Sequence, residues 1–291
     1  MGALPFRSHV SHCLLLGVLT GLACRAPETA ERGSSRALPE MTVAPTEDFQ
    51  LTGDGSAPAW ARAEWVPLDR RGDAGLEYET RVKVLYSATG LYVLMDGSDE
   101  RITATMTEDF LDLWHEDVFE VFLWTDEGYP VYFEYEISPL GYELPILIPN
   151  FGGEFLGWRP WHYEGERRTR RATAAVGGPR EPGASITGWR AEVFIPWTLL
   201  EPLQGVPPGP GSVWRANFYR VDYDGATPTA WHWAPVTGTF HEFTRFGVLR
   251  FGPSGEGDAQ GPADPGPRAR RYGPSSTISS RPAQPRPSRH E

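Results

Sequence analysis

Hydrophobic and polar residues alternate with a period of two over many short segments of this chain, which is the pattern of strands with one buried face. Gly, Pro, Asp and Ser residues separate these segments, as expected for turns. The expected strands span residues 80–86, 90–95, 117–124, 130–138, 188–196, 213–223 and 246–251, with residues 167–176 as an edge strand and residues 141–153 as a loop or a short strand pair. About eight to ten strands with little helix predict an all-β fold, a two-sheet antiparallel β-sandwich of jelly-roll type.

The stretch from Leu113 to Asn150 has the strongest pattern and holds two strands joined by a tight acidic turn. Because successive strand side chains point to opposite faces of a sheet, each strand divides into two rows. The apolar rows, which belong in the core, are Phe119, Val121 and Leu123 in the first strand and Val131, Phe133, Tyr135 and Ile137 in the second. The opposite face then carries Glu120, Trp124, Tyr132, Glu134 and Glu136. The other arrangement would place Glu120 in the core, at a desolvation cost that few domains tolerate.

The composition supports short strands and excludes several functions. The 291 residues include 32 Gly, 28 Pro and 11 Trp, as expected for strands joined by tight turns. The formal net charge is −11 and no stripe of Lys and Arg is present, which argues against a nucleic-acid partner. Both cysteines, Cys13 and Cys24, precede the folded part of the chain, so that part contains neither a disulfide nor a thiolate metal site.

Both ends of the chain differ in composition from a folded domain. Residues 1–24 combine an apolar run with small residues before Cys24, the pattern of a secretory signal, and resemble the bacterial lipoprotein signal in which that Cys is lipidated. Residues 25–45 predict a flexible linker and residues 253–291 a disordered tail. One domain, residues 46–252, is therefore expected in a protein exported to the bacterial cell envelope or the extracellular space. A lipid anchor on Cys24 would be its only attachment to a membrane.

The face of rings and carboxylates suits a sugar. Flat apolar sides of sugar rings pack on aromatic side chains, while carboxylates accept hydrogen bonds from hydroxyl groups. Other interpretations stay open: a solvated or packed face without a ligand, an envelope scaffold that uses the sandwich for protein contacts, or glycoside hydrolysis. Hydrolysis needs two carboxyls across one bond, which Glu120 with Glu134 or Glu136 could provide.

The sequence requires no metal or other cofactor. Its histidines follow no compact zinc spacing. A structural Ca²⁺ is compatible with Asp54, Asp96 and Asp99, which lie near turns, although no loop of the EF-hand type is present.

Several motifs, in order and spacing, resemble carbohydrate-binding module family 9 and its DOMON-like relatives. They are Thr52-Gly53-Asp54-Gly55 before Trp60, the strand pair at residues 80–86 and 90–95, the W-x-x-D-x-x-E pattern from Trp114 to Glu120, and the segments Gly188 to Trp197, Val213 to Phe218 and Phe243 to Leu249. The likeness covers about residues 46–252. It implies a non-catalytic jelly-roll module that binds carbohydrate and accompanies glycoside hydrolases in polysaccharide breakdown.

The resemblance also implies the residues of the binding site. Two aromatic rings would hold a terminal sugar, namely Trp114 of the W-x-x-D-x-x-E pattern and Phe240 shortly before the final Phe-Gly motif. Glu120 would accept hydrogen bonds from sugar hydroxyls, whereas Glu134 stands where some members carry a cation, which leaves the preferred sugar open. The carbohydrate-binding set expected on this basis is Trp114, Glu120, Glu134, Asn217, Tyr219 and Phe240.

Overall fold

The computed structural model of the chain describes residues 37–73, 75–152, 154–157, 159–161 and 164–253. The expected signal segment with Cys24, the first part of the expected linker and the expected tail from residue 254 onward lie outside these residues. No helix in the described part of the chain is long and apolar enough to cross a membrane.

Strands are the main regular structure of the described residues, so the all-β prediction is confirmed. They are β1 (Glu40–Pro45), β2 (Val66–Pro67), β3 (Asp69–Arg70), β4 (Thr80–Tyr86), β5 (Gly90–Ser98), β6 (Val118–Trp124), β7 (Val131–Ile137), β8 (Glu143–Phe151), β9 (Glu154–Phe155), β10 (Arg159–Pro160), β11 (Arg170–Val176), β12 (Gly188–Pro196), β13 (Val213–Asp222), β14 (Thr229–His232) and β15 (Gly247–Phe251). The helical elements are short: η1 (Pro58–Arg62), η2 (Leu113–His115), η3 (Gly165–Arg167), α1 (Trp197–Leu200) and η4 (Phe243–Arg245). Residues 143–151, expected as a loop or a short strand pair, form the single strand β8.

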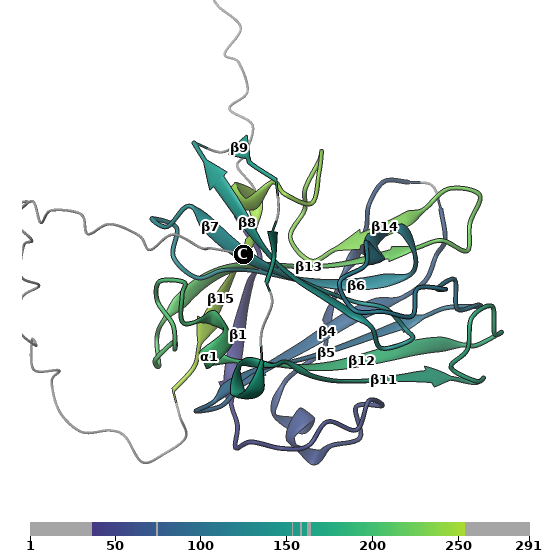
Figure 1. Ribbon diagram of the computed structural model, residues 1–291, viewed down its shortest axis with the longest axis horizontal. Coiled ribbons are helices and arrows are strands. Elements are labelled where there is room, and N and C mark those ends of the chain that lie inside the picture. Colours follow the sequence, from purple (N-terminus) through teal and green to yellow (C-terminus); the bar gives the residue numbers. More distant parts are fainter. Residues whose placement is uncertain (1–36, 74, 153, 158, 162–163, 254–291) are drawn as a thin grey trace, which may run out of the picture. The chain divides into compact units, whose positions relative to one another are not determined.

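Strand pairing follows one continuous path, β10-β8-β7-β6-β13-β15-β1-β4-β5-β12-β11. β1 folds this path into two layers, because its first four residues pair with β15 and its last two with β4. The first layer contains β6, β7, β8 and β13, and the second contains β4, β5, β11 and β12 (Figure 1). Both pairings of β1 are parallel, which departs from the wholly antiparallel sandwich expected. β1 also shows that the folded domain begins before residue 46.

The hydrophobic core lies between the two layers. Phe119 of β6 stacks on Trp189 of β12 with ring centroids 3.8 Å apart. The predicted core rows of β6 and β7 are confirmed, since Phe119, Val121, Leu123, Phe133, Tyr135 and Ile137 all belong to this core and Val131 packs against it. Glu120, Glu134 and Glu136 therefore lie on the outer face of the first layer, as alternation predicted.

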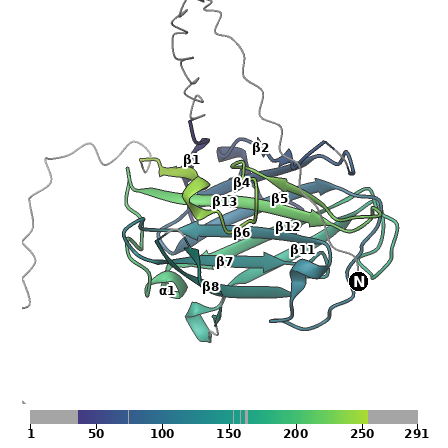
Figure 2. The same ribbon diagram turned by 90° about the horizontal axis from the view of Figure 1, so that it is seen from above.

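Glu120, Glu134 and Glu136 form an acidic row on this face, and the register of the strands determines which residues lie next to them. In the ladder between β6 and β7, Glu120 lies opposite Glu136 and Phe122 opposite Glu134. β13 adjoins β6 on its other side (Figure 2), with Tyr219 opposite Glu120. This outer face carries a second apolar cluster, which includes Val118, Phe122, Trp124, Tyr132, Ile146, Phe243 and Phe246. η2 and the segment around η4 cover the face, so the acidic row is buried instead of open to solvent.

Candidate functional site

A pocket of about 450 Å³ opens on the outer face of the first layer. η2 contributes Trp114 to its wall, and the segment before η4 contributes Thr239, Phe240 and His241. Its other lining residues are Glu120, Phe122, Glu134, Glu136, Ile146, Phe155 and Val221. The wall therefore combines aromatic and aliphatic surface with a small number of acidic groups, which is typical of sites for small organic ligands.

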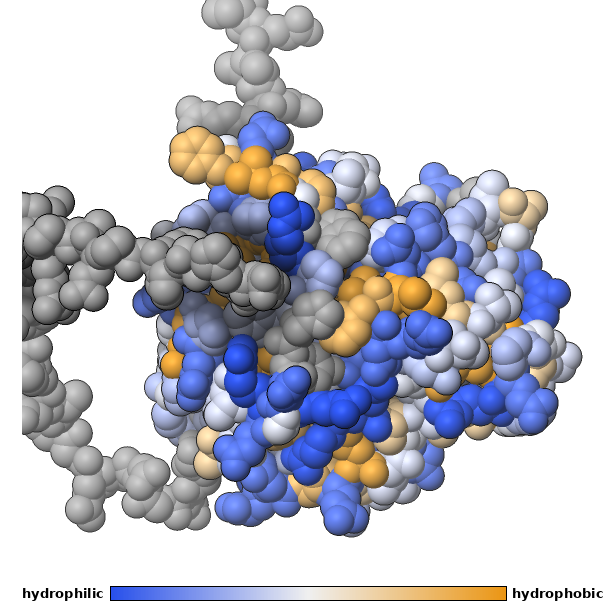
Figure 3. Space-filling view, in the orientation of Figure 1, coloured by the Kyte–Doolittle hydropathy of each residue, from blue (hydrophilic) through white to orange (hydrophobic). Residues whose placement is uncertain are grey.

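Apolar side chains gather beside this pocket. Figure 3 shows apolar surface at the end of the molecule where β8 and β9 project. Phe151, Phe155 and Leu156 are exposed in this hairpin, and the ring of Phe155 also lines the pocket. The hairpin thus extends the aromatic wall beyond the rings that the sequence predicted.

The three carboxyl groups of the pocket are almost completely removed from water. Glu120 is 2%, Glu134 4% and Glu136 1% exposed. Oε2 of Glu134 and Oε2 of Glu136 have no hydrogen-bond partner among the described residues. Because an unpaired buried polar atom is costly, these oxygens need either a proton or a ligand.

Burial and mutual repulsion shift the three carboxyls toward their protonated forms. Burial raises the pKa of Glu120 from its ordinary value of 4.5 to about 8. Burial, and then the nearby charge of Glu120, raises the pKa of Glu134 well above 4.5. The same two effects, together with Glu134, raise the pKa of Glu136. Near neutral pH the pocket therefore holds protons that it can release when a suitable ligand binds.

His241 joins the acidic row to the aromatic wall. Its Nδ1 lies 2.7 Å from the hydroxyl of Tyr132 and 3.7 Å from Oε2 of Glu134. The imidazole stacks on Phe155, with centroids 4.1 Å apart and planes within 14°. Burial lowers the pKa of His241 to about 4, so the ring is neutral at physiological pH and contributes no positive charge to Glu134.

The ring of Phe240 rests on a buried support. It stacks on Tyr219 with centroids 4.0 Å apart and planes within 7°, and the Tyr219 hydroxyl donates to the Phe240 carbonyl at 2.8 Å. The amide of Asn217 donates to that hydroxyl at 2.7 Å and to the Ala234 carbonyl at 2.8 Å. The support fixes the place of Phe240, whose ring reaches the pocket.

The W-x-x-D-x-x-E pattern has a structural explanation. Asp117 accepts hydrogen bonds from the backbone N–H of Thr103 at 2.6 Å and of Tyr223 at 2.9 Å. The Tyr223 hydroxyl donates to the carbonyl of Trp114. Asp117, the Asp of the pattern, thus connects the end of η2 to the segments around Thr103 and Tyr223, while Trp114 and Glu120 line the pocket.

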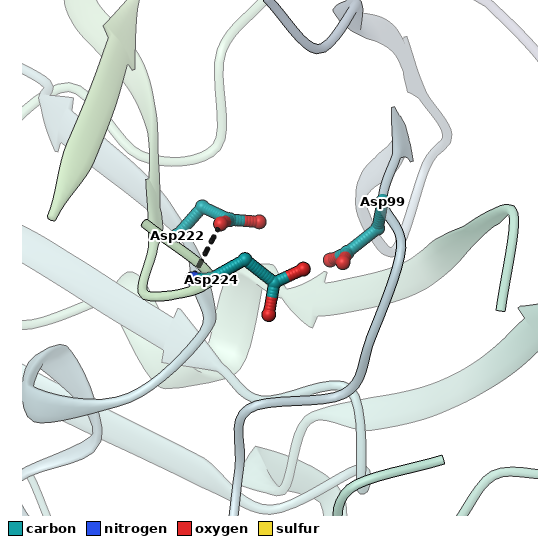
Figure 4. A group of neighbouring side chains, drawn as sticks. All are labelled: Asp99, Asp222 and Asp224. Atoms are coloured by element: carbon teal, nitrogen blue, oxygen red, sulfur yellow. Dashed lines mark hydrogen bonds between the residues drawn. The ribbon is translucent and has the colours of Figure 1, made fainter. Parts of the chain in front are cut away.

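A separate acidic cluster lies where β13 ends. Asp99, Asp222 and Asp224 each place one carboxylate oxygen within 4.8 Å of the others (Figure 4). Arg220 is fully buried and donates to Asp99 at 3.0 Å and to Asp222 at 2.6 Å. Burial raises the pKa of Asp99 to about 9 against the effect of Arg220, so one guanidinium serves two carboxyls and Asp99 keeps a proton.

Oxygen ligands of this kind suit Ca²⁺, but the cluster already contains a cation in Arg220. The other residues considered for calcium lie elsewhere. Asp96 binds Arg81 and Arg190, and Asp54 accepts a hydrogen bond from the backbone N–H of Ser56. The three aspartates named from the sequence therefore do not form one site, and only Asp99 belongs to the cluster.

The chain folds as a two-layer sandwich with a ring-lined pocket on one outer face. Residues 52–142 match the sequence model of the carbohydrate family 9 binding domain-like family, a segment that includes Trp114, Glu120 and Glu134. This segment is thus similar to that family, which confirms the resemblance predicted from the motifs. No curated protein matches the chain significantly.

Solved structures show the same fold at low sequence identity. A candidate carbohydrate-binding protein from Bacteroides uniformis has a TM-score of 0.61 at 18% identity and covers 74% of this chain and 100% of its own. A family 9 module from Caldicellulosiruptor kristjanssonii in complex with cellotriose has a TM-score of 0.53 at 16% identity, over 78% of this chain and 100% of its own. In complex with glucose, a module from that organism has a TM-score of 0.54 at 14% identity, over 76% and 100%.

The structure brings together four of the six predicted site residues, which are Trp114, Glu120, Glu134 and Phe240. Asn217 and Tyr219 are fully buried beneath Phe240 and do not line the pocket.

Pocket residues that the predicted set omitted are Glu136, His241, Phe155, Thr239, Ile146 and Val221. Alternation identifies Glu136 and Val221, because they continue the rows of Glu134 and Tyr219. No local pattern identifies His241 and Phe155, which meet only through the folding of distant segments.

Proposed function

We propose that this domain binds carbohydrate without catalysis and holds a sugar ring between Trp114 and Phe240, with hydrogen bonds to Glu120 and its neighbouring carboxyls. The observation that carries the proposal is that Phe240 lines a single pocket with Trp114 and Glu120, from which it is distant in sequence. Aromatic faces and buried acids are the groups that a sugar ring with its hydroxyls requires. The cellotriose and glucose complexes of structurally similar modules support carbohydrate as the ligand class.

The arrangement of the acids favours binding over glycoside hydrolysis. Glu120, Glu134 and Glu136 all project from one sheet face on two neighbouring strands, with Glu120 directly opposite Glu136. A glycosidase places its two carboxyls on either side of the scissile bond. The acids of this pocket lie side by side, so they can contact one edge of a sugar.

We also propose a role outside the cytoplasm. The signal pattern before Cys24 supports export, with a lipid on that Cys as the anchor to the bacterial envelope. A binding module held there would keep polysaccharide or glycan fragments near enzymes that degrade them.

Titration calorimetry with cellotriose and with glucose tests the binding proposal. Trp114→Ala and Phe240→Ala should each weaken binding by about 1–3 kcal/mol, because each removes a ring that packs on the sugar. Trp65→Ala is the matched control, since Trp65 packs against the cluster around Trp60 and Tyr92, away from the pocket. Unchanged affinity in both ring variants, with circular dichroism showing an intact fold, would contradict the proposed site.

A further inference from the structure

The pocket is acidic and has no cation to balance it. Three of its lining residues are glutamates, and no Lys or Arg lines it among the described residues. A neutral sugar would form hydrogen bonds in such a site but would bring no counter-charge, so the carboxyls could not ionise in this low-dielectric environment. Since the described wall has no positive group, we expect the ligand to supply one.

Nearby cations have other partners. Arg71 lies 5.1 Å from the centre of the Phe240 ring, and its guanidinium donates to the carbonyl of Gly238 at 2.7 Å. Arg245 forms an ion pair with Glu242 at 3.1 Å. These arginines sit at the rim formed by the segment before η4, and neither lines the pocket with the buried acids.

The other titratable groups that face the acids are neutral. Tyr132 on β7 and Tyr219 on β13 are close enough that the acids contribute to raising the pKa of their hydroxyls, as is Tyr223 just beyond β13. His241 is held neutral by burial, and β8 contributes the apolar Ile146. No group packed around the acids supplies the missing positive charge.

The carboxyls of Glu134 and Glu136 lie close enough to hydrogen-bond to each other, but only while one of them holds a proton. Their Oε2 atoms are buried and accept no hydrogen bond from a described N–H or hydroxyl group, while both side chains line the pocket. An ammonium group offers three N–H donors and a full positive charge, and its hydrogen bonds to carboxylates are charge-assisted and strong. The ring of Trp114 adds cation–π attraction for such a group.

We propose that the pocket selects a sugar bearing a protonated amino group, of the glucosamine type, whose ammonium lies against Glu120, Glu134 and Glu136 while its ring packs on Trp114 and Phe240. This inference rests on the proposed carbohydrate-binding function and narrows its ligand class. N-acetylated and simple neutral sugars lack the charge that the acidic row requires. The entering ammonium favours ionised carboxylates, so binding releases protons from the acids to the solvent.

Calorimetry at pH 6.5 with three trisaccharides tests this inference: a β-1,4-linked glucosamine trimer, its N-acetylated form, and cellotriose. The glucosamine trimer should bind at least about tenfold more tightly than either neutral trimer, as one charge-assisted contact can provide. Its observed enthalpy should also change with the ionisation enthalpy of the buffer, since protons are released. Cellotriose should show no such dependence.

Variants of the pocket glutamates test which residues cause the preference for the glucosamine trimer. Glu134→Gln and Glu136→Gln should lower affinity for the glucosamine trimer by about tenfold more than affinity for cellotriose. Glu181→Gln is the matched control, because Glu181 is exposed and lies outside the pocket. The ligand comparison on the unmodified protein decides the question even where a variant fails to fold.

The outcomes separate the two proposals. Equal affinity for amino and neutral trimers, or preference for a neutral one, overturns the inference and leaves carbohydrate binding intact. Failure of all three trimers and of glucose to bind overturns the carbohydrate function and the inference together. A preference for the glucosamine trimer that persists in both Gln variants also overturns the inference, because Glu134 and Glu136 then do not bind the amino group.

Discussion

Replacing Glu120 by Gln should stabilise the folded domain at neutral and alkaline pH and leave its stability near pH 4 unchanged. Burial raises the pKa of Glu120 from 4.5 to about 8. A proton that is held more tightly in the folded state contributes stability that is fully present below pH 4.5 and is lost as the pH rises to 8. Each pKa unit corresponds to about 1.4 kcal/mol, so the loss reaches about 3 kcal/mol at pH 7 and about 5 kcal/mol at pH 8. Glutamine has nearly the same shape and never ionises, so the variant escapes this loss.

Urea unfolding followed by tryptophan fluorescence at pH 4, 6, 7 and 8 measures the effect as the difference in unfolding free energy between Glu120→Gln and the unmodified domain. That difference should grow from near zero at pH 4 to several kcal/mol at pH 8. His241 cancels in the difference because burial alone shifts its pKa, whereas Glu134 and Glu136 lose the repulsion of Glu120 in the variant, which adds to the difference at high pH. The exposed control Glu181→Gln should follow the unmodified domain at every pH. An equal difference at pH 4 and pH 8 would refute the assignment of a raised pKa to Glu120.

Three further predictions concern the rest of the chain. Arg220→Met should lower the unfolding free energy at pH 7 by about 3–5 kcal/mol, since Asp99 and Asp222 lose their buried cation, and unchanged stability would contradict that role. The melting temperature should be the same with and without a calcium chelator, because Arg220 already compensates the acidic cluster; a drop that added Ca²⁺ restores would show a structural ion instead. Cys24→Ser should abolish incorporation of a fatty-acid probe in a bacterial host, and persistent labelling would argue against lipidation at that residue.

Alternation was sufficient to predict most of the longer strands, and its failure at β8 has a local cause. Residues 143–151 contain Pro145 and Pro149, which lack a backbone N–H and so argue against a strand inside a sheet. β8 tolerates them because only the two-residue strands β9 and β10 flank it on the side away from β7. β1 was missed for a different reason. Its first four residues pair with β15, which is distant in sequence, and the pattern within residues 40–45 does not predict that pairing.

Some features of the candidate site follow from local sequence, and others depend on contacts between distant segments. The strand period is a property of β6 and β7 themselves, so the face that carries Glu120 and Glu134 could be predicted. Burial of that face could not, since it depends on η2 and on the segment around η4 closing over it. The same closure brings His241 against Tyr132 and Phe155. Contacts of this kind follow from tertiary packing, which alternation does not describe.

The acidic row lowers the stability of the ligand-free domain at neutral pH. Its position in the pocket therefore indicates a role in ligand binding. Three buried glutamates with raised pKa values destabilise the fold as the pH rises, and apolar residues at the same positions would carry no such loss. Departures from the best packing are concentrated where a protein binds its ligands. A ligand that brings a cation lets the acids ionise in place, so its binding should strengthen as the pH rises from 5 to 7. Bound ligand stabilises a fold in proportion to its affinity, so a glucosamine trimer should raise the melting temperature more at pH 7 than at pH 5, whereas cellotriose should not.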